Sequence, residues 1–237
     1  MRLKILCVIP ARGGSKGIPN KNLRILGDRP LIAHVIGTAL KCKLIDHIVV
    51  STDNEAILDT AKEFGAETPF VRPSCIAQDS TPLNPVVSHA IQHYESTGFF
   101  ADAVISLQPT NPFTSEATIT KALEKFQETG CDSVVTVAEI KHGHPYRAKK
   151  ITEGARLENF CTEFDGDMFL NRQERPAAYT YTGALYLRGS QLIKSWSGRD
   201  MGLGNDCRGL LVGWKEAINI DDELDFRLAE LVLKENL

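Results

Sequence analysis

Short apolar segments alternate with longer amphipathic segments along this chain. The short ones are rich in β-branched and aliphatic residues, which is typical of buried strands. The longer ones repeat their apolar positions at helical spacing, and several end at glycine. This alternation predicts an α/β fold with a mainly parallel sheet and helices on both of its faces. The predicted strands are residues 3–9, 47–52, 67–71, 103–107, 133–137, 183–187, 210–214 and 217–221, and the predicted helices are residues 30–42, 55–64, 85–95, 115–129 and 223–234.

The alternation breaks between residues 139 and 181. This stretch is basic and then acidic, contains several glycines and prolines, and has no long amphipathic repeat. The whole chain of 237 residues is long enough for one buried α/β core, and no proline- or serine-rich linker divides it. We therefore expect a single domain over residues 1–237, with residues 139–181 as an inserted segment.

Composition and charge narrow the function. Hydrophobic residues make up 43% of the chain, charged residues 24%, and the formal net charge is −3. This balance argues against generic binding to nucleic acid or acidic membranes, so an anionic ligand would have to be held by local charge. The six cysteines include no C-x-x-C pair, and Pro10 and Arg12 end the first apolar run too early for a signal peptide. We expect a cytoplasmic protein with reduced thiols and no membrane segment.

The loop after the first predicted strand has the composition of a phosphate site. Glycine lets the backbone turn its N–H groups toward an anion, and basic side chains on the same loop add positive charge. The spacing is neither that of a P-loop nor that of a dinucleotide-binding fingerprint. An ordinary strand-to-helix turn with solvated basic residues is the alternative. The loop spans residues 10–22, and its glycines and cations are Gly13, Gly14, Gly17, Arg12, Lys16 and Lys21.

Polar residues also follow the next predicted strands, at residues 51–53, 72–81 and 108–112. In open parallel sheets ligands bind outside the carboxyl ends of the strands. Each of these segments alone is an ordinary turn. Together they predict cations, amides and hydroxyls along one rim of the sheet.

A carboxylate segment lies near the end of the sequence. In a strand over residues 217–221, Asn219 and Asp221 share one face. Mg²⁺ prefers oxygen ligands and keeps waters and substrate phosphates, so one or two such side chains suffice. The alternative is a helix N-cap at Asp221, followed by the acidic residues Asp222 and Glu223.

Five segments together resemble the CMP-sialic acid synthetases, the N-acylneuraminate cytidylyltransferases that include enzymes for legionaminic and pseudaminic acid. The segments are IPARGGSKGIPNKNL, RPSCIAQD, LQPTNPF, RQERPAAYTYTGALYL and INIDDELDF, in family order over residues 9–226. The resemblance implies a Rossmann-like nucleotidyltransferase fold with a small dimerisation subdomain at residues 139–181. It also implies that CTP and a nine-carbon sugar acid give a CMP-sugar and pyrophosphate, in a homodimer with shared active sites.

The resemblance also assigns roles to individual residues. Arg12, Lys16 and Asp221 are the expected catalytic residues, and Mg²⁺ is the expected cofactor, held by Asp221 and Asn219. The expected nucleotide-binding residues are Arg12, Gly13, Gly14, Ser15, Lys16, Asn22, Arg72 and Thr81. The expected acceptor-binding residues are Gln108 and Thr182, together with Arg147 and Arg172 from the neighbouring subunit.

Two positions depart from the family pattern. Asn219 stands where the family has a second metal carboxylate, and residues 180–182 read Thr-Tyr-Thr where sialate-specific members have Arg-Pro-Asn. The second difference leaves legionaminic, pseudaminic or another carboxylated acceptor open, including 3-deoxy-manno-octulosonate. The first leaves open a catalytically weak nucleotide-binding protein. No histidine or cysteine matches a catalytic position, so no general base is assigned.

Overall fold

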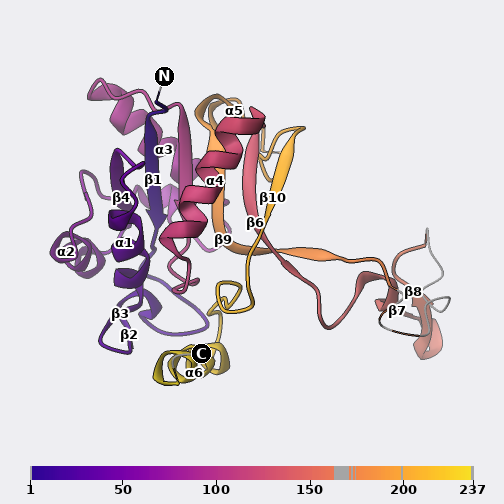
Figure 1. Cartoon of the computed structure of the whole chain (residues 1–237). Coiled ribbons are helices and arrows are strands. Elements are labelled where there is room, and N and C mark those ends of the chain that lie inside the picture. Colours follow the sequence, from indigo (N-terminus) through magenta and orange to yellow (C-terminus); the bar gives the residue numbers. More distant parts are fainter. Residues whose placement is uncertain (1, 163–170, 172, 174, 199, 236–237) are drawn as a thin grey trace.

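A six-stranded sheet forms the centre of the molecule, in the strand order β10-β6-β9-β5-β1-β4 (Figure 1). The computed structural model describes residues 2–162, 171, 173, 175–198 and 200–235. All sheet strands run parallel except β9, which pairs antiparallel with β5 and β6. The predicted mainly parallel sheet is therefore confirmed. The strands are β1 (Ile5–Pro10), β4 (His47–Ser51), β5 (Ala103–Leu107), β6 (Ser133–Glu139), β9 (Tyr179–Gly189) and β10 (Cys207–Leu211).

Helices cover both faces of the sheet, as the alternation predicts. Successive side chains of a strand point to opposite faces. Cys7 and Ile9 of β1 accordingly pack with α1, α2 and α4, whereas Leu6 and Val8 pack with α3 and α5. The helices are α1 (Leu31–Lys41), α2 (Glu55–Glu63), α3 (Leu83–Ser96), α4 (Glu116–Thr129), α5 (Ser190–Lys194) and α6 (Glu223–Lys234). Short 3₁₀ turns are η1 (Lys21–Leu23), η2 (Ser74–Ile76), η3 (Pro145–Arg147) and η4 (Glu153–Ala155).

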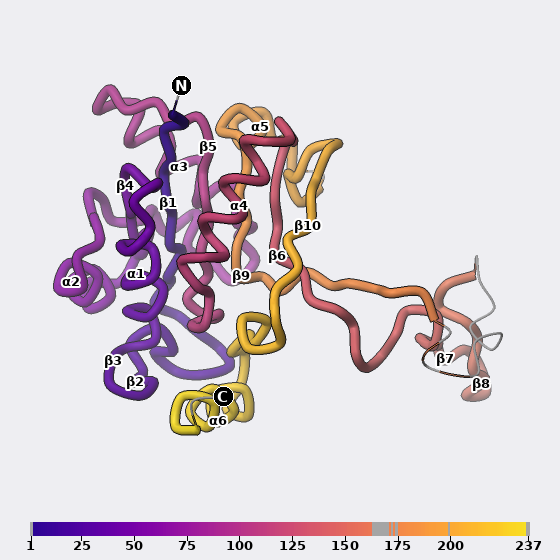
Figure 2. The backbone as a smooth tube through the Cα atoms, in the orientation of Figure 1, coloured from indigo at the N-terminus to yellow at the C-terminus, as the bar shows by residue number. Residues whose placement is uncertain are grey.

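Helix α6 lies beyond one end of the sheet (Figure 2). It belongs to an apolar cluster that is separate from the two clusters packed on the sheet faces. We call this the α6 cluster; Phe226 of the helix packs there with Ile18 of the glycine loop and with Ile218 and Ile220. The small hairpin of β2 (Ile25–Leu26) and β3 (Arg29–Pro30) contributes the buried Leu26. Residues from both ends of the sequence therefore meet beside the carboxyl ends of the strands.

Two predicted strands are wrong. Residues 67–71 make only an isolated bridge, between Glu67 and Val49. Residues 217–221 form no strand, because Ala217 lies in a turn and its N–H donates to the carbonyl of Gly213. The backbone of this segment makes hydrogen bonds to other loops instead of to a neighbouring strand. The N–H of Ile220, for example, donates to the Thr110 carbonyl at 2.8 Å. The last sheet strand, β10, also begins earlier than predicted.

The chain leaves the sheet after Glu139 and returns to it at Tyr179 (Figures 1 and 2). We call the intervening segment the arm. Its described part holds an antiparallel pair, β7 (Lys149–Thr152) and β8 (Arg156–Asn159), which projects away from the sheet. Ile151 of β7 is 76% exposed and Leu157 of β8 is 67% exposed. The pattern break in the sequence thus coincides with a segment that does not join the core of the sheet.

The six cysteines form no disulfide bond within the residues that the structure describes. Three of them, Cys7, Cys42 and Cys131, are buried. Burial raises the pKa of the Cys7 thiol, which keeps it protonated. None of the helices in the described ranges combines the length and apolar character needed to cross a membrane.

Candidate active site

Two adjoining cavities meet at the carboxyl ends of the parallel strands. The first, of about 380 Å³, is the glycine-loop cavity; the second, of about 510 Å³, is the Arg188 cavity, which extends along β9 to Arg188, opposite Val104 of β5. They share Pro82, Leu83, Gln108, Thr110 and Asp221 on their walls. The glycine-loop cavity brings together eight of the residues to which the resemblance assigns roles: Arg12, Ser15, Lys16, Asn22, Arg72, Thr81, Gln108 and Asp221.

The glycine loop is held in place from both sides. The N–H of Gly13 donates to Oδ1 of Asp53 at 2.9 Å, and Nδ2 of Asn22 donates to the carbonyl of Arg12 at 3.1 Å. Gly17 passes so close to the backbone carbonyl of Asp221 that a Cβ at this position would clash with it. Glycine at position 17 therefore lets the loop approach the Asp221 segment. By contrast, a Cβ at Gly14 would meet open space.

Arg12 and Lys16 share one carboxylate, that of Asp79. Nη1 of Arg12 pairs with Oδ1 of Asp79, and Nζ of Lys16 lies 2.5 Å from Oδ2. Two cations facing one carboxylate leave a local excess of positive charge. A phosphate group can replace Asp79 as their partner, because guanidinium and ammonium groups pair with phosphate as they do with carboxylate. Asp79 belongs to the polar segment of residues 72–81 expected along the rim, but no individual role was assigned to it from the sequence.

Arg72 adds a further positive charge to the wall of the glycine-loop cavity. Its side chain is buried, and Nε donates to Oγ of Ser51 at 3.1 Å while Nη2 donates to the Ser51 carbonyl. Burial lowers the pKa of Arg72 to about 10, with Asp53 acting in the opposite direction. The guanidinium therefore remains protonated at neutral pH.

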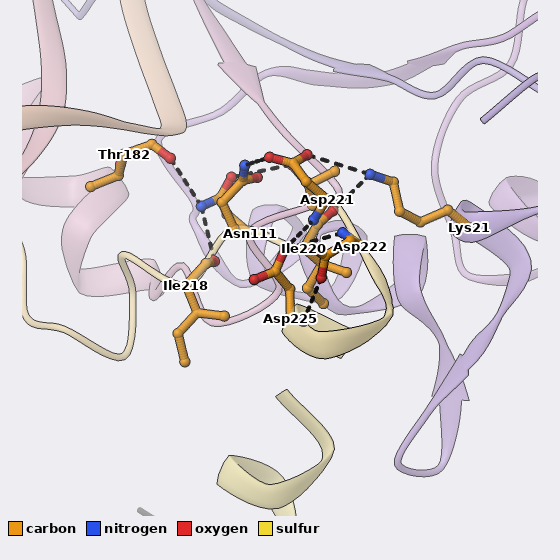
Figure 3. A network of polar contacts seen from close by, with 10 residues as sticks. Lys21, Asn111, Thr182, Ile218, Ile220, Asp221, Asp222 and Asp225 are labelled. Carbon is orange, nitrogen blue, oxygen red and sulfur yellow. Dashed lines mark hydrogen bonds and ion pairs between the residues drawn. The ribbon is translucent and has the colours of Figure 1, made fainter. Parts of the chain in front are cut away.

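Asn219 and Asp221 lie side by side, although their segment is not a strand. Figure 3 shows Lys21 directed toward Asp221. Nδ2 of Asn219 donates to Oδ2 of Asp221 at 2.5 Å, and Nζ of Lys21 lies 3.6 Å from Oδ1. Lys21 also donates to the Ile220 carbonyl at 2.7 Å. Burial lowers the pKa of Lys21, and the neighbouring Asp221 opposes that shift. Lys21 thus supports both the backbone and the carboxylate of this segment.

The cap of α6 is Asp222, not Asp221. The Asp222 side chain accepts from the N–H groups of Leu224 and Asp225, and the Asp225 carboxylate accepts from the N–H of Asp222 at 3.1 Å. This reciprocal pair is a capping box. The helix-cap alternative thus applies to the neighbouring residue, and the Asp221 side chain is 71% exposed at the cavity.

The donor set at Asn219 and Asp221 fits a cation that keeps most of its own water. Within the described ranges, no three His, Cys, Asp or Glu side chains gather into a metal cluster. One carboxylate and one amide oxygen are too few for an all-protein cage, but they suit Mg²⁺ that is also bound by phosphates and water. Coordination by Asn219 requires its amide oxygen rather than Nδ2 to face the ion.

The other predicted residues lie elsewhere. Thr182 is buried, with Oγ1 2.7 Å from Oγ1 of Thr136, and its carbonyl accepts from Asn111, so its acceptor-binding role stays a prediction (Figure 3). Arg147 is exposed on the arm and lines neither cavity. Arg172 lies outside the described residues.

The Arg188 cavity was not expected from the sequence beyond Gln108 and the metal pair. Tyr186 and Arg188 of β9 line it, two residues apart on one face of the strand, and Asn84 of α3 lies opposite. Arg188 falls just past the predicted strand of residues 183–187, which is why the pattern did not single it out.

The fold and the two cavities together define an α/β nucleotidyltransferase. The cytidylyltransferase family profile matches residues 6–192, so the chain belongs to that family. It is 35% identical over 236 residues to the CMP-N,N'-diacetyllegionaminic acid synthase of Legionella pneumophila, covering 99% of this chain and 98% of the relative. It is 32% identical over 235 residues to the pseudaminic acid cytidylyltransferase of Campylobacter jejuni, covering 99% and 98% of the two chains.

The fold also matches a solved structure. A CMP:2-keto-3-deoxy-manno-octonic acid synthetase complexed with CTP superposes with a TM-score of 0.73, covering 99% of this chain and 100% of the other, at 17% identity. At this identity the likeness confirms the fold. The expected cytidylyltransferase family and the Rossmann-like nucleotidyltransferase fold are therefore both confirmed.

The capping box predicts separate effects for two adjacent aspartates. Asp222→Ala removes the cap and should lower the melting temperature by about 2–4 °C, which corresponds to about 1 kcal/mol in a chain of this size. Asp221→Ala leaves the cap intact and should not shift it. Thermal unfolding followed by circular dichroism measures both. The reverse order, with Asp221→Ala the less stable variant, would contradict the assignment of the cap.

Proposed function

We propose that the protein transfers CMP from CTP to the anomeric hydroxyl of a sialic-acid-like nonulosonic acid and releases pyrophosphate. The observation that carries this proposal is the junction of the two cavities at Gln108 and Asp221. A triphosphate suits the cationic glycine-loop cavity, and the Arg188 cavity beside it leaves room for a sugar acid. The names of the two relatives, a legionaminic acid and a pseudaminic acid enzyme, support this acceptor class.

Catalysis of this reaction comes mainly from positioning the two substrates and from stabilising the negative charge that develops in the transition state. The sugar hydroxyl forms a bond to the α-phosphorus of CTP, the bond from that phosphorus to the bridging oxygen breaks, and pyrophosphate leaves with the electron pair. Arg12 and Lys16 exchange Asp79 for the triphosphate and hold the charge that develops on pyrophosphate. The proton of the sugar hydroxyl is released in the same step, and no side chain is assigned as its general base.

Asp221 and Asn219 would hold Mg²⁺ at the junction. When bound, the ion supplies positive charge to the phosphate oxygens. The side chains of Asn219 and Asp221 orient one another through their hydrogen bond. Lys21 holds the backbone between them by donating to the Ile220 carbonyl. Asn219 in place of a carboxylate reduces the negative charge offered to the metal.

Gln108 is the proposed contact to the acceptor, because it lies on the wall shared by both cavities. Residues 180–182 carry hydroxyls and an aromatic ring in place of the cation and amide of sialate-specific enzymes. We therefore favour legionaminic or pseudaminic acid over N-acetylneuraminic acid. The free cysteines agree with the proposed cytoplasmic location.

Pyrophosphate release tests the function directly. The purified protein is incubated with CTP, Mg²⁺ and N,N'-diacetyllegionaminic, pseudaminic, N-acetylneuraminic or 3-deoxy-manno-octulosonic acid in turn. We expect turnover with a nonulosonic acid and none without acceptor. Turnover only with 3-deoxy-manno-octulosonate would move the acceptor to the shorter sugar acid. Binding of CTP without turnover on any acid would indicate a nucleotide-binding protein.

Arg12→Ala should lower kcat/KM for CTP by about 100- to 1000-fold, because it removes a charge-assisted contact to the developing pyrophosphate. Arg29→Ala is the matched control, since Arg29 pairs with the neighbouring Asp28 outside both cavities. Steady-state kinetics and a melting curve are recorded for each variant. A folded Arg12→Ala enzyme with the kcat/KM of the parent would show that the loop does not hold the triphosphate.

The metal assignment predicts opposite effects at two neighbouring positions. Asp221→Ala should nearly abolish turnover, whereas Asn219→Asp should keep it and lower the Mg²⁺ concentration for half-maximal rate by adding a charged ligand. Asp222→Ala is the control, since Asp222 caps α6 and should leave the Mg²⁺ requirement unchanged. Full activity in Asp221→Ala would remove that residue from the metal site.

The arm is the proposed dimerisation segment. Its hairpin exposes Ile151 and Leu157, and Tyr179 and Tyr181 at the start of β9 are also about half exposed. Apolar side chains on a segment without a core of its own suit burial against a second copy. In a two-fold dimer, each arm then carries Arg147 and Arg172 toward the partner's acceptor cavity.

A complementation experiment tests this sharing. Arg12→Ala and Arg147→Ala should each be inactive as homodimers. Heterodimers that carry one lesion in each subunit should regain activity, since one of their two sites contains neither lesion. Subunit exchange is verified with two affinity tags. Inactive heterodimers, or a fully active monomer in analytical ultracentrifugation, would contradict the shared site.

A further inference from the structure

Arg188 is a buried cation without a carboxylate partner. Its side chain is only 1% exposed, although it lines the Arg188 cavity. Nη1 donates to Oδ1 of Asn84, and Nη2 makes a long hydrogen bond of 3.4 Å to Oγ of Ser106. Nε has no hydrogen-bond partner within the part of the chain that the structure describes. Within the same residues, no ion pair joins Arg188 to an aspartate or glutamate.

This arrangement is costly for the protein alone. Taking a guanidinium out of water without an opposite charge is unfavourable. Burial lowers the pKa of Arg188 to about 10, so the group is still charged at neutral pH. A residue with a purely structural role at this position would be better served by an apolar side chain or by a nearby carboxylate.

A second positive element faces the same space. Helix α3 begins where the two cavities meet: Pro82 and Leu83 line both of them, and Asn84 lines the Arg188 cavity. The N-terminal end of a helix carries partial positive charge, and the Pro82 cap makes no side-chain hydrogen bond to neutralise it. The dipole and the guanidinium have the same sign, so both favour an anion in the cavity.

We propose that Arg188 binds the carboxylate of the acceptor sugar acid from within the same chain. The Nε and Nη2 edge of the guanidinium is the edge with the fewest partners, and it matches the two oxygens of a carboxylate. The cavity opens at Gln108 and Asp221 toward the predicted nucleotide, so a sugar acid bound there reaches the reaction centre. This assignment rests on the proposed function. It adds a cation of the chain itself to the arm arginines predicted from the partner subunit.

The test compares three variants by steady-state kinetics with the best acceptor of the panel. Arg188→Met removes the charge at similar length, and Arg188→Lys keeps a charge without the planar fork. Arg29→Met is the control, because Arg29 pairs with Asp28 outside both cavities. We expect KM for the acceptor to rise about 10- to 100-fold in Arg188→Met, with KM for CTP unchanged. Arg188→Lys should recover part of that loss, and Arg29→Met should change neither constant.

A second measurement separates the carboxylate from other groups of the sugar. Binding of the acceptor acid and of its carboxamide analogue is compared by calorimetry in the presence of CMP. The parent enzyme should bind the acid more tightly than the carboxamide. In Arg188→Met, the ratio of the two dissociation constants should fall by about the same factor by which KM for the acceptor rises. A preference that Arg188→Met and Arg188→Lys both retain in full would overturn the assignment.

The outcomes also distinguish this inference from the function on which it rests. An inactive parent protein with every acid of the panel would overturn both. An active parent whose Arg188→Met variant has a lower melting temperature but an unchanged acceptor KM would overturn the inference alone, and would make Arg188 a structural residue between β9 and α3. If Arg188→Met does not fold, Arg188→Lys becomes the decisive variant. An acceptor KM in Arg188→Lys equal to that of the parent would then overturn the inference.

Discussion

The α6 cluster is the packing on which the active site depends. It joins Ile18 from the first loop to Ile218 and Ile220 near the other end of the chain, and Phe226 of α6 closes it. Removing these side chains from water is what holds two distant segments together. The glycine loop and the Asn219–Asp221 pair are thereby set against each other without a regular strand between them, and their geometry relies on apolar burial more than on hydrogen-bonded ladders.

Positive charge in excess of its local partners is the second organising feature. Arg12 and Lys16 divide one carboxylate between them, and the guanidiniums of Arg72 and Arg188 are buried against neutral oxygens. Arg12, Lys16 and Arg72 thus line one cavity of a chain whose formal net charge is −3. Local positive charge of this kind attracts anionic substrates.

The sequence predicts the regular elements well and the irregular ones poorly. Strand β5 and helix α6 have the predicted bounds, because strong periodicity and clear end signals define them. Residues 217–221 alternate like a strand, yet their hydrogen bonds go to side chains and loops that no local pattern reveals. Both the placement of the cap at Asp222 rather than Asp221 and the pairing of Asp79 with Arg12 depend on tertiary contacts. Arg188 escaped notice because an arginine at a strand end ordinarily reaches solvent.

The close approach at Gly17 has a consequence for how this protein can change over evolutionary time. The group that excludes a side chain there is a main-chain carbonyl, which is present whatever residue occupies position 221. A compensating substitution at the contact is therefore impossible, in contrast to a clash between two side chains. Mutational drift can alter the metal ligand, the cap and the acceptor pocket one by one, while position 17 stays fixed as long as the loop and the last segment remain together.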